Sequence, residues 1–469
     1  MLDVAGKHVH VIGLGAKGTG RAVALVLGPL GAQVTISDAK PAAELAGEVE
    51  KLAGLPVRLL LGPEEAYRDI EQADLVVPSP GVPLTIPPLQ RARAAGVPIL
   101  SEVELAYRLA QGPIIAITGT KGKTTTTTLI GLFIAATGRP AHVGGNIGKP
   151  LIELAAAANP GELLVAELSS FQLEAVDQFR PHVAVFTNLY PDHLDRYAQS
   201  MDAYLDAKLN LFARQQAEDV AVLNADRPES ARVARATRAR IIQVSTERRV
   251  PGGVYLAGDE IISEIGGAPK RIAGVGDIRL RGAHNQANVL EAIAAVEACG
   301  IDTAAVAAGV LADFRGVPNR LEEVDTIDGV AFYNDSQGTT PDAVRMALLA
   351  FAATPPVLIA GGRAKVTDFS ELGRHIATHA RALIAIGEAA EPIAAAVRNV
   401  DPAFPIYRAE SLPAAVEEGF ALARPAGVVL LSPACASFDM FRNMEHRGDV
   451  FRQAVADLRR TISGVRSCE

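Results

Sequence analysis

The stretch ITGTKGKTT, residues 117–125, decides which kind of fold this chain adopts. The apolar run at residues 113–117 predicts a buried strand, and residues 124–136 have the composition of a helix. A strand, a glycine-containing loop and a Gly-Lys-Thr triplet that opens a helix are the parts of a P-loop, where backbone N–H groups face nucleotide phosphates. The stretch therefore predicts an α/β domain that binds a nucleotide phosphate.

Two side chains of this loop have chemical roles to fill. Lys123 can neutralise the β- and γ-phosphates, and the Thr124 hydroxyl can be a ligand of Mg²⁺. An ordinary glycine-containing turn is the alternative, but it does not explain why strand, triplet and helix occur together. The predicted nucleotide-binding residues are Gly119, Thr120, Lys121, Gly122, Lys123, Thr124 and Thr125.

Short β-branched runs alternate with Ala- and Leu-rich stretches along the rest of the chain, the pattern of βαβ units around parallel sheets. The predicted strands are residues 8–12, 33–37, 75–77, 113–117, 163–168, 182–187, 220–224, 330–333, 356–360, 382–386 and 428–432. The pattern restarts twice, so we expect three domains: a Rossmann-like domain at 1–102, a central P-loop domain at 103–317 and a second Rossmann-like domain at 318–469. The glycine-rich residues 250–278 predict an antiparallel insertion.

A second glycine-rich loop follows the first predicted strand. The motif is Gly13-x-Gly15-x-x-Gly18, and Asp38 ends the second predicted strand. This is the dinucleotide-binding fingerprint, which alone predicts an NAD-dependent oxidoreductase. Its backbone N–H groups suit any diphosphate, however, including that of a UDP-sugar, and a turn at residues 78–81 should reach the same ligand. The predicted substrate-binding residues here are Gly15, Ala16, Lys17, Gly18, Asp38, Ser79, Pro80 and Gly81.

Composition excludes several classes of function. The formal net charge of −8 argues against a nucleic-acid-binding protein, which needs a basic surface. The three cysteines, Cys299, Cys435 and Cys468, fit neither a disulfide framework nor a zinc site. No uninterrupted apolar stretch of about 18 residues predicts a membrane span, and residues 1–6 do not resemble a signal peptide. We expect a cytoplasmic monomer.

Seven further motifs, together with the P-loop, resemble those of the Mur ligase family over residues 6–451. They are GGNIG at 144–148, ELSSFQLE at 167–174, DHLDRY at 192–197, Ala207-Lys208, His284-Asn285, Asn334-Asp335-Ser336 and SPACASFD at 432–439. The blocks at 167–172 and 432–437 resemble the branch of the family that adds glutamate.

The resemblance implies an ATP-dependent ligase of peptidoglycan synthesis. The Rossmann-like N-terminal domain would bind the UDP-linked substrate, the central domain ATP, and the C-terminal domain the amino acid and part of ATP. The reaction implied is addition of D-glutamate to UDP-N-acetylmuramoyl-L-alanine through an acyl phosphate, with ATP and Mg²⁺, two ions being expected. The sequence leaves the stereochemistry of the amino acid open.

The resemblance also assigns roles to catalytic residues. It implies that Glu167 and His193 accompany Thr124 at the metal, and that Lys208 is carbamylated so that it too can hold Mg²⁺. The predicted catalytic residues are Lys123, Glu167, His193 and Lys208. The alternatives are a helix-capping glutamate, a loop histidine and a solvated helix lysine.

Substrate contacts follow from the resemblance in the same way. Asn146 and Ser169 would face the substrate. Asn285, Arg320 and Asp335 would contact ATP, and an arginine suits phosphate because its fork is bidentate. The residues implied to hold glutamate are Thr339, Lys365 and Ser437.

The C-terminal third departs from the family pattern. Gln337 stands where a lysine is usual, and Gly338 where an alanine is. Asn319 stands where a histidine is usual, and Ala364 where an aspartate is. Met444 replaces an aromatic residue, and Met440 stands where Gln is common. A divergent D-glutamate ligase, a ligase for L-glutamate or another amino acid, and a paralogue that only binds the UDP-muramoyl precursor all fit these changes.

Two other classes of enzyme remain as alternatives. A folylpolyglutamate-type ligase shares the P-loop and the modified lysine, but the N-terminal glycine motif and the block at 167–172 speak against it. A dehydrogenase would use the first domain and leaves the P-loop unexplained.

Overall fold

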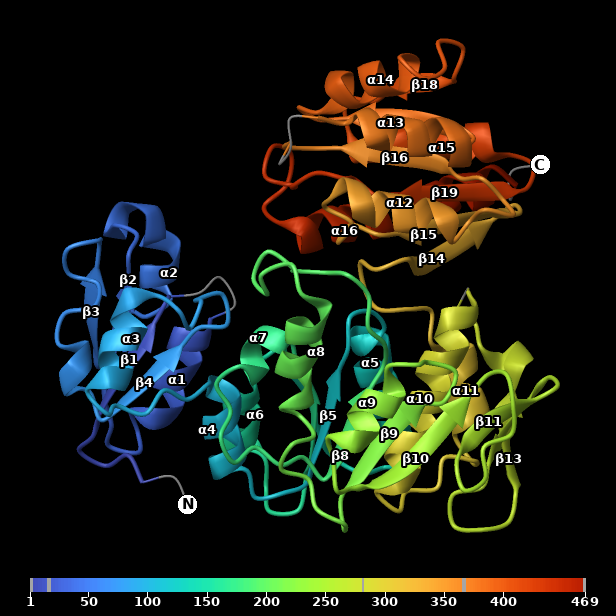
Figure 1. The fold of residues 1–469 in the computed structure, drawn as a ribbon. Helices are drawn as coiled ribbons and strands as arrows, with labels where there is room; N and C mark the ends of the chain where they lie inside the picture. The colour runs from blue at the N-terminus through green and yellow to red at the C-terminus, as the bar shows by residue number, and fades with distance from the viewer. Residues whose placement is uncertain (1–2, 15–17, 281, 365–367, 467–469) are drawn as a thin grey trace. The chain divides into compact units, whose positions relative to one another are not determined.

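The computed structural model describes residues 3–14, 18–280, 282–364 and 368–466. The chain divides into two compact units, Met1–Ile278 with Ala283–Ala312, and Arg279–Gly282 with Asp313–Glu469. Three separate sheets confirm an α/β fold of three domains, of which the first two belong to the first unit (Figure 1). The boundaries expected at 102/103 and 317/318 stay predictions.

The first sheet has four parallel strands in the order β3-β2-β1-β4. They are β1 (His8–Ile12), β2 (Gln33–Asp38), β3 (Val57–Leu61) and β4 (Leu75–Pro78), with α1 (Thr19–Leu27), α2 (Ala46–Glu50) and α3 (Pro87–Ala94) around them. Because β1 lies between β2 and β4 in parallel register, the loops after these three strands meet at one edge of the sheet.

The second sheet has nine strands in the order β13-β12-β11-β10-β9-β8-β5-β7-β6. They are β5 (Ile114–Thr118), β6 (Ala141–Gly145), β7 (Leu163–Glu167), β8 (Val183–Phe186), β9 (Val220–Asn224), β10 (Arg240–Ser245), β11 (Val254–Ala257), β12 (Glu260–Ser263) and β13 (Lys270–Gly274). Strands β11 to β13 pair antiparallel, which confirms the insertion predicted at residues 250–278. Strand β11, the innermost of the three, joins β10 in parallel.

Eight helices among the described residues accompany this sheet. They are α4 (Glu102–Leu109), α5 (Lys123–Ala136), α6 (Leu151–Ala157), α7 (Ser170–Leu173), α8 (Met201–Leu209), α9 (Ser230–Arg235), α10 (Ala283–Ala298) and α11 (Ala307–Asp313). Helices α5 and α10 pack against each other, so the helix that starts at the P-loop has a buried partner.

The third sheet lies in the second unit and has the order β14-β15-β19-β16-β17-β18. Its strands are β14 (Glu322–Ile327), β15 (Val330–Asn334), β16 (Val357–Gly361), β17 (Ala382–Ile386), β18 (Ile406–Arg408) and β19 (Gly427–Leu431). All pairs are parallel except β14 with β15. Every predicted strand of the chain is confirmed to within one residue at each end.

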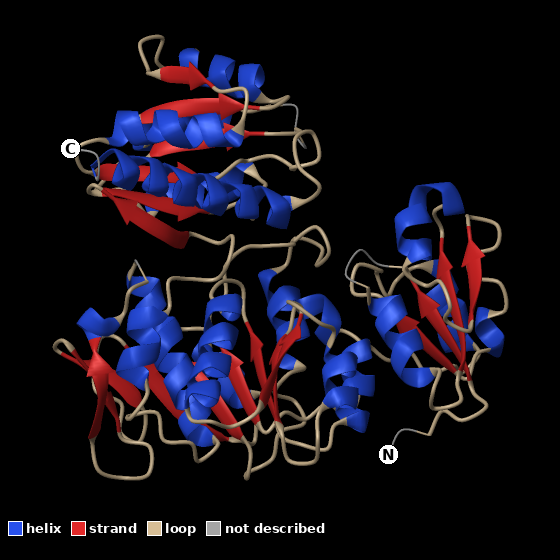
Figure 2. Ribbon diagram, turned by 180° about the vertical axis from the view of Figure 1, so that it is seen from behind, coloured by secondary structure: helices blue, strands red, loops and turns tan. Residues whose placement is uncertain are grey.

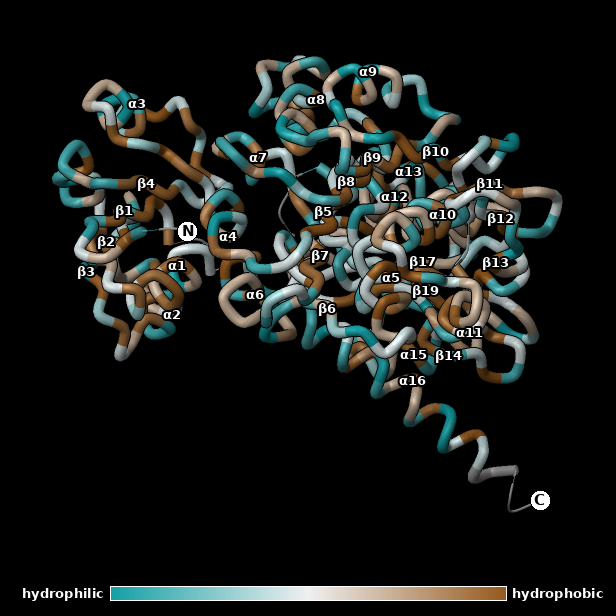
Figure 3. Tube along the Cα trace, turned by 90° about the horizontal axis from the view of Figure 1, so that it is seen from below, coloured by the Kyte–Doolittle hydropathy of each residue, from teal (hydrophilic) through white to brown (hydrophobic). Residues whose placement is uncertain are grey.

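Helices cover both faces of this third sheet (Figure 2). One core lies between the sheet and α12 (Pro341–Leu349), α13 (Ser370–His379) and α14 (Ala390–Arg398). The other lies between the sheet and α15 (Leu412–Ala423) and α16 (Met444–Arg466). Strands buried on both faces read as continuous apolar runs, which is why the sequence revealed them and why they are brown in Figure 3.

One buried carboxylate organises the start of the central domain. Glu104 is fully buried in α4, and its Oε2 accepts hydrogen bonds from the backbone N–H groups of Asp177, Gln178 and Phe179 at 2.8, 3.0 and 3.0 Å. Its Oε1 pairs with Arg108 at 2.8 Å. The loop before β8 is thereby held to α4. None of the helices in the described ranges combines the length and apolar character of a membrane span.

Replacing Glu104 by alanine should therefore destabilise the protein markedly. The change leaves three N–H groups, that of Phe179 buried and the other two half-buried, without an acceptor, and we expect a loss of about 3 kcal/mol in the free energy of unfolding. Urea unfolding followed by circular dichroism measures it. Glu71→Ala is the matched control, because Glu71 pairs with Arg91 on the surface and should contribute less than about 1 kcal/mol. Equal losses for both variants would contradict the role of Glu104.

Candidate active site

The P-loop is held in shape by the segment that follows β8. The backbone N–H of Thr120 donates to the carbonyl of Asn188 at 2.9 Å, and the N–H of Lys121 donates to Oδ1 of Asn188 at 2.9 Å. The hydroxyl of Thr187 donates to the carbonyl of Lys121 at 2.7 Å. Thr187 and Asn188 thus support the P-loop, and the sequence analysis did not single them out. Their only signal was their place at the carboxyl end of a strand next to β5.

Glu167 is the point at which three predicted site residues converge. It ends β7 beside β5, is buried, and accepts the Thr124 hydroxyl at 2.7 Å on Oε2 and the Asn146 amide at 2.7 Å on Oε1. It does not cap a helix, so that alternative is wrong. A carboxylate beside a hydroxyl and an amide offers the oxygen donors that Mg²⁺ prefers.

Lys208 reaches the same loop from α8. Its side chain is 1% exposed, and Nζ donates to the carbonyl of Gly119 at 2.8 Å. It lies 4.4 Å from the centre of the Tyr204 ring. Burial, and then the nearby charge of Lys123, hold the pKa of Lys208 well below its usual range. Lys208 is therefore not the solvated helix lysine of the alternative interpretation.

His193 lies on an exposed loop, with φ of 53° and half of its side chain accessible. Its ring is 5.0 Å from that of Phe171, and Nδ1 is 3.8 Å from Asp192. Over the ranges that the structure describes, no three His, Cys, Asp or Glu side chains gather closely enough to hold a metal ion. The structure thus joins Thr124 to Glu167, while the role of His193 at the metal stays a prediction.

The glycine loop after β1 meets the turn after β4. The Ser79 hydroxyl donates to the carbonyl of Gly13 at 2.6 Å. Asp38 accepts the backbone N–H of Leu14 at 3.0 Å on Oδ2 and that of Lys40 at 3.0 Å on Oδ1. Gly18, with φ of 75°, precedes α1. The predicted residues Gly15, Ala16 and Lys17 lie outside the described residues.

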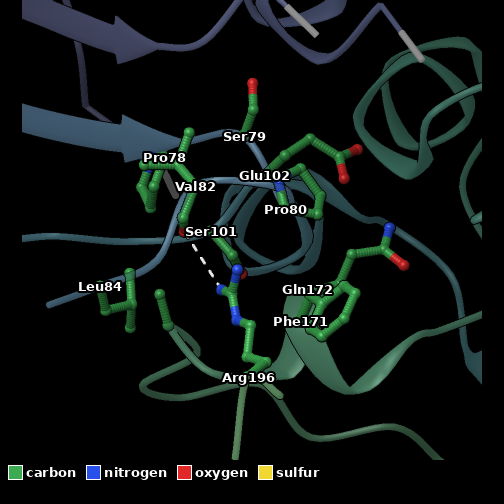
Figure 4. Close-up of a pocket in the computed structure, with 11 residues that line it drawn as sticks. Pro78, Ser79, Pro80, Val82, Leu84, Ser101, Glu102, Phe171, Gln172 and Arg196 are labelled. Carbon is green, nitrogen blue, oxygen red and sulfur yellow. Dashed lines mark hydrogen bonds between the residues drawn. The ribbon is translucent and has the colours of Figure 1, made fainter. Parts of the chain in front are cut away.

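A small cavity lies between this turn and the central domain (Figure 4). Ser79, Glu102, Phe171 and Arg196 contribute to its lining, and its volume of about 10 Å³ has room for roughly one water molecule. Burial raises the pKa of Glu102 to about 7, and Oε1 accepts the N–H of Ile152 at 2.6 Å. The cavity is too small for a substrate.

The second unit carries its own polar cluster at the carboxyl ends of β15 and β19. Asp335 is buried and accepts the Ser432 hydroxyl at 2.7 Å and the N–H of Leu321 at 3.3 Å. Burial raises the pKa of Asp335 to about 7. Arg447 has no exposed surface and donates to the hydroxyl and carbonyl of Ser336 at 3.0 and 2.9 Å and to the carbonyl of Cys435 at 3.1 Å.

The sequence reasoning missed Arg447. The sequence feature that could have indicated its burial is its spacing of four residues from Phe451. This spacing puts both side chains on the face of α16 that is buried against the third sheet. A cation in that position needs several acceptors, and the loops after β15 and β19 supply them. Arg447 thereby ties together the loops that carry Asp335 and Ser437.

Three of the residues that depart from the family pattern, Gln337, Asn319 and Met444, make hydrogen bonds in this cluster. Oε1 of Gln337 accepts Nε of Arg320 at 2.8 Å, and Oδ1 of Asn319 accepts the amide of Asn334 at 2.9 Å. The carbonyl of Met444 accepts the Ser336 hydroxyl at 2.7 Å. Ala364 is exposed.

The remaining predicted residues are distributed as follows. Ser437 is buried and Thr339 half-buried in the second unit, while Lys365 lies outside the described residues. In the first unit, Ser169 caps α7 and pairs with Gln172, and Oδ1 of Asn285 accepts the amide of Asn288 at 2.9 Å. None of these contacts tests the ligand assigned to the residue.

Comparison with protein families finds three matches in succession. The Mur ligase MurD-like N-terminal domain matches residues 7–101, the Mur ligase middle domain residues 117–296, and the Mur ligase glutamate ligase domain residues 319–435. A UDP-N-acetylmuramoylalanine–D-glutamate ligase from Pelotomaculum thermopropionicum is 43% identical over 98% of this chain and 99% of its own. The enzyme of the same name from Geotalea uraniireducens is 42% identical over 97% and 99%.

Solved structures match in fold. UDP-N-acetylmuramate-alanine ligase from Thermotoga maritima superposes with a TM-score of 0.56 at 20% identity, over 96% of this chain and 99% of its own. MurF from Acinetobacter baumannii gives 0.56 at 20%, over 75% and 79%. At such identities the match shows the fold alone.

Gly119 should not tolerate a side chain, because its φ is 144° and an added Cβ would lie 2.1 Å from the Thr187 hydroxyl. We expect Gly119→Ala to weaken binding of a non-hydrolysable ATP analogue about tenfold or more, as measured by calorimetry. The reason is that the P-loop would have to move away from Thr187 and Asn188, which hold its shape. In Gly138→Ala, at a position that also has positive φ but open space around it, stability should fall without loss of nucleotide affinity. An unchanged affinity of Gly119→Ala for the ATP analogue would refute the role of Thr187 and Asn188 in holding the P-loop.

Proposed function

The chain belongs to the Mur ligase family, and on that premise we propose that it adds D-glutamate to UDP-N-acetylmuramoyl-L-alanine at the expense of ATP. The relatives that match it over nearly their whole length carry that activity in their names. The observation on which the proposal depends most is the convergence of Thr124 and Asn146 on buried Glu167, with Lys208 bound to Gly119 of the same P-loop. This is a site for phosphoryl transfer to a carboxylate.

The reaction has two steps. A carboxylate oxygen of the UDP-linked substrate attacks the γ-phosphorus of ATP, which forms an acyl phosphate and releases ADP. The amine of D-glutamate then attacks the acyl carbon, the C–O bond to phosphate breaks, and inorganic phosphate and one proton leave. Both steps bring anions together, so positioning and positive charge supply most of the catalysis.

The P-loop supplies part of that charge in the first step. Lys123 lies at the start of α5, and the backbone N–H groups at the helix N-terminus favour phosphate. Thr124, Glu167 and Asn146 would hold Mg²⁺, because their oxygen donors fit a hard cation. When bound, the ion supplies neutralisation of the phosphate oxygens.

We assign Lys208 as the carbamylated lysine that would help to hold a second Mg²⁺. Burial, and then the charge of Lys123, hold the pKa of its amine well below the usual range, which favours the neutral, nucleophilic amine over the ammonium form. The amine nitrogen attacks CO₂, an N–C bond forms, and the proton leaves to solvent. The product is an anion, which removes the repulsion with Lys123 that lowers this pKa.

Glutamate binding and the rest of ATP binding are assigned to the second unit. Thr339, Lys365 and Ser437 would bind glutamate, and Arg320 with Asp335 would bind ATP together with Asn285. Gln337 supports this by holding Nε of Arg320. We also propose that the enzyme acts in the cytoplasm as a monomer.

The alternative functions have less support. A dehydrogenase function gives no role to the P-loop or to Thr187 and Asn188, which hold it. A folylpolyglutamate-type ligase does not account for the N-terminal domain match at residues 7–101. A ligase for L-glutamate or a binding-only paralogue would rest on the departures of the C-terminal third, and the side chains of two of these, Asn319 and Gln337, make hydrogen bonds within the cluster.

Phosphate release from ATP tests the proposal directly. With UDP-N-acetylmuramoyl-L-alanine and Mg²⁺ present, we expect release with D-glutamate and only background release with L-glutamate or with no amino acid. Glu167→Gln should lower kcat about a hundredfold or more, because it removes the buried carboxylate. Release with L-glutamate instead would identify a different specificity, and release with neither amino acid would exclude the ligase.

Chemical rescue tests the role of Lys208. We expect Lys208→Ala to be almost inactive and to regain activity when acetate or formate is added, since a small carboxylate can occupy the place of the carbamate. Lys123→Ala is the control, because it lacks a cation rather than an anion and should gain nothing from the same salts. Absence of rescue in Lys208→Ala, with nucleotide binding retained, would rule out the carbamate.

A further inference from the structure

Arg196 connects the loop that carries His193 to the turn that ends β4. Its Nη1 donates to the carbonyl of Gly81 at 3.3 Å and its Nη2 to the carbonyl of Val82 at 3.1 Å, the second of which is drawn in Figure 4. These carbonyls lie more than a hundred residues earlier in the chain, in the domain that binds the UDP-linked substrate under the proposed function.

Glu174 fixes the same guanidinium from its other side. Its Oε1 accepts Nε at 3.1 Å and its Oε2 accepts Nη2 at 2.6 Å, and the Tyr197 hydroxyl donates to Oε1 at 2.7 Å. The side chains of Arg196 and Glu174 are only 13% and 15% exposed. This is a shielded, bidentate ion pair with a defined geometry, unlike the exposed pairs elsewhere on the surface.

The aromatic ring of Phe171 packs on both ends of this arrangement. The Arg196 guanidinium lies 4.6 Å from the centre of the ring, and the His193 ring centre lies 5.0 Å from it. Phe171 belongs to α7, whose first turn is capped by Ser169. The loop with His193, the helix with Ser169 and the turn with Gly81 therefore meet around one guanidinium.

The turn itself has a second attachment on its opposite side. The Ser79 hydroxyl donates to the carbonyl of Gly13 at 2.6 Å, and the N–H of Val82 donates to the carbonyl of Ser79 at 2.9 Å. The glycine loop and Arg196 thus hold the turn from two directions. The peptide planes at Gly81 and Val82 are oriented by their carbonyls, so the direction of the neighbouring N–H groups is set as well.

The charge of Arg196 is already satisfied within the protein. Nε and Nη2 face the Glu174 carboxylate, Nη1 and Nη2 face carbonyls, and the ring of Phe171 covers one face. Such a guanidinium does not act as a phosphate ligand. What it can do is hold the turn at residues 79–82 in place relative to the loop that carries His193. A lysine lacks the planar fork needed to make these bonds together.

We propose that Arg196 is a positioning residue that sets the affinity for the UDP-linked substrate, by fixing the 79–82 turn against the His193 loop through its ion pair with Glu174. The proposal rests on the proposed function for the identity of that substrate. It predicts a selective effect: the site for the UDP-linked substrate should weaken, while the P-loop and the glutamate site keep their affinities.

The experiment compares Arg196→Met, Arg196→Lys and Glu174→Gln with the wild-type enzyme. KM is measured separately for UDP-N-acetylmuramoyl-L-alanine, ATP and D-glutamate by phosphate release, and Kd for the UDP-linked substrate by calorimetry. We expect Arg196→Met to raise the KM and Kd of that substrate about tenfold, with the other two KM values within about twofold. The KM and Kd values of Arg196→Lys and Glu174→Gln for the UDP-linked substrate should lie between those of Arg196→Met and the wild-type enzyme.

Arg180→Met is the matched control. Arg180 also pairs with a buried carboxylate, Asp219, at 2.6 Å, but it does not contact the turn. It should lose comparable thermal stability and keep the wild-type KM for the UDP-linked substrate. Equal changes in all three KM values, or an unchanged KM and Kd for the UDP-linked substrate in Arg196→Met, would overturn the proposal. If Arg196→Met does not fold, the test uses Arg196→Lys and Glu174→Gln. Their KM for the UDP-linked substrate should then rise more than their KM values for ATP and D-glutamate.

If the wild-type enzyme releases no phosphate, the proposed function is refuted, but the proposal on Arg196 can still be tested. Calorimetry on the UDP-linked substrate needs no turnover, so the comparison of Arg196→Met with Arg180→Met still gives a positive or a negative answer.

Discussion

Two lysine side chains donate to one backbone carbonyl, that of Gly119, and the centre of the protein is organised around this contact. Nζ of Lys208 lies 2.8 Å from it and Nζ of Lys123 3.0 Å. Two ammonium groups so placed, that of Lys208 buried and that of Lys123 half-buried, repel each other more strongly than they would in water. Burial, and then this repulsion, lower the pKa of Lys208, and an anion at the loop would relieve the repulsion. The site is thus built for negative charge, as ATP and a carbamate both require.

This arrangement depends on backbone geometry that only certain neighbours allow. Gly119 points its carbonyl at both lysines because its φ of 144° is open to glycine, and the Thr187 hydroxyl fills the space where a Cβ would be. The segment after β8 then fixes Thr120 and Lys121 through Asn188. Charge, loop shape and strand order therefore form one system, in which the parallel neighbours β7, β5 and β8 each bring one part to the same edge.

Local patterns predicted the strands and the P-loop because both are encoded in consecutive residues. The eleven strands predicted from apolar runs lie within one residue of the observed bounds, and glycine-rich residues 250–278 form the antiparallel insertion. Contacts between distant residues could not be predicted in this way. Asn188 meets Lys121 across 67 positions, and Arg447 meets Ser336 across 111. Neither residue type indicates such a partner, because asparagine in a loop and arginine in a helix are usually solvated.

In the second unit, a residue that matches the family pattern can still make different contacts, because a neighbouring residue has changed. An added Cβ at Gly338 would lie 2.4 Å from Oδ2 of Asp335 and 2.7 Å from the Ser432 hydroxyl, so the alanine usual in the family does not fit this arrangement. Glycine lets the Asp335 carboxyl turn inward, where Ser432 and the N–H of Leu321 occupy both of its oxygens and burial raises its pKa to about 7. A ligand that is to use Asp335 must displace one of these donors. The substitution at 338 therefore acts through its neighbour, and the departures in this cluster have to be interpreted together rather than position by position.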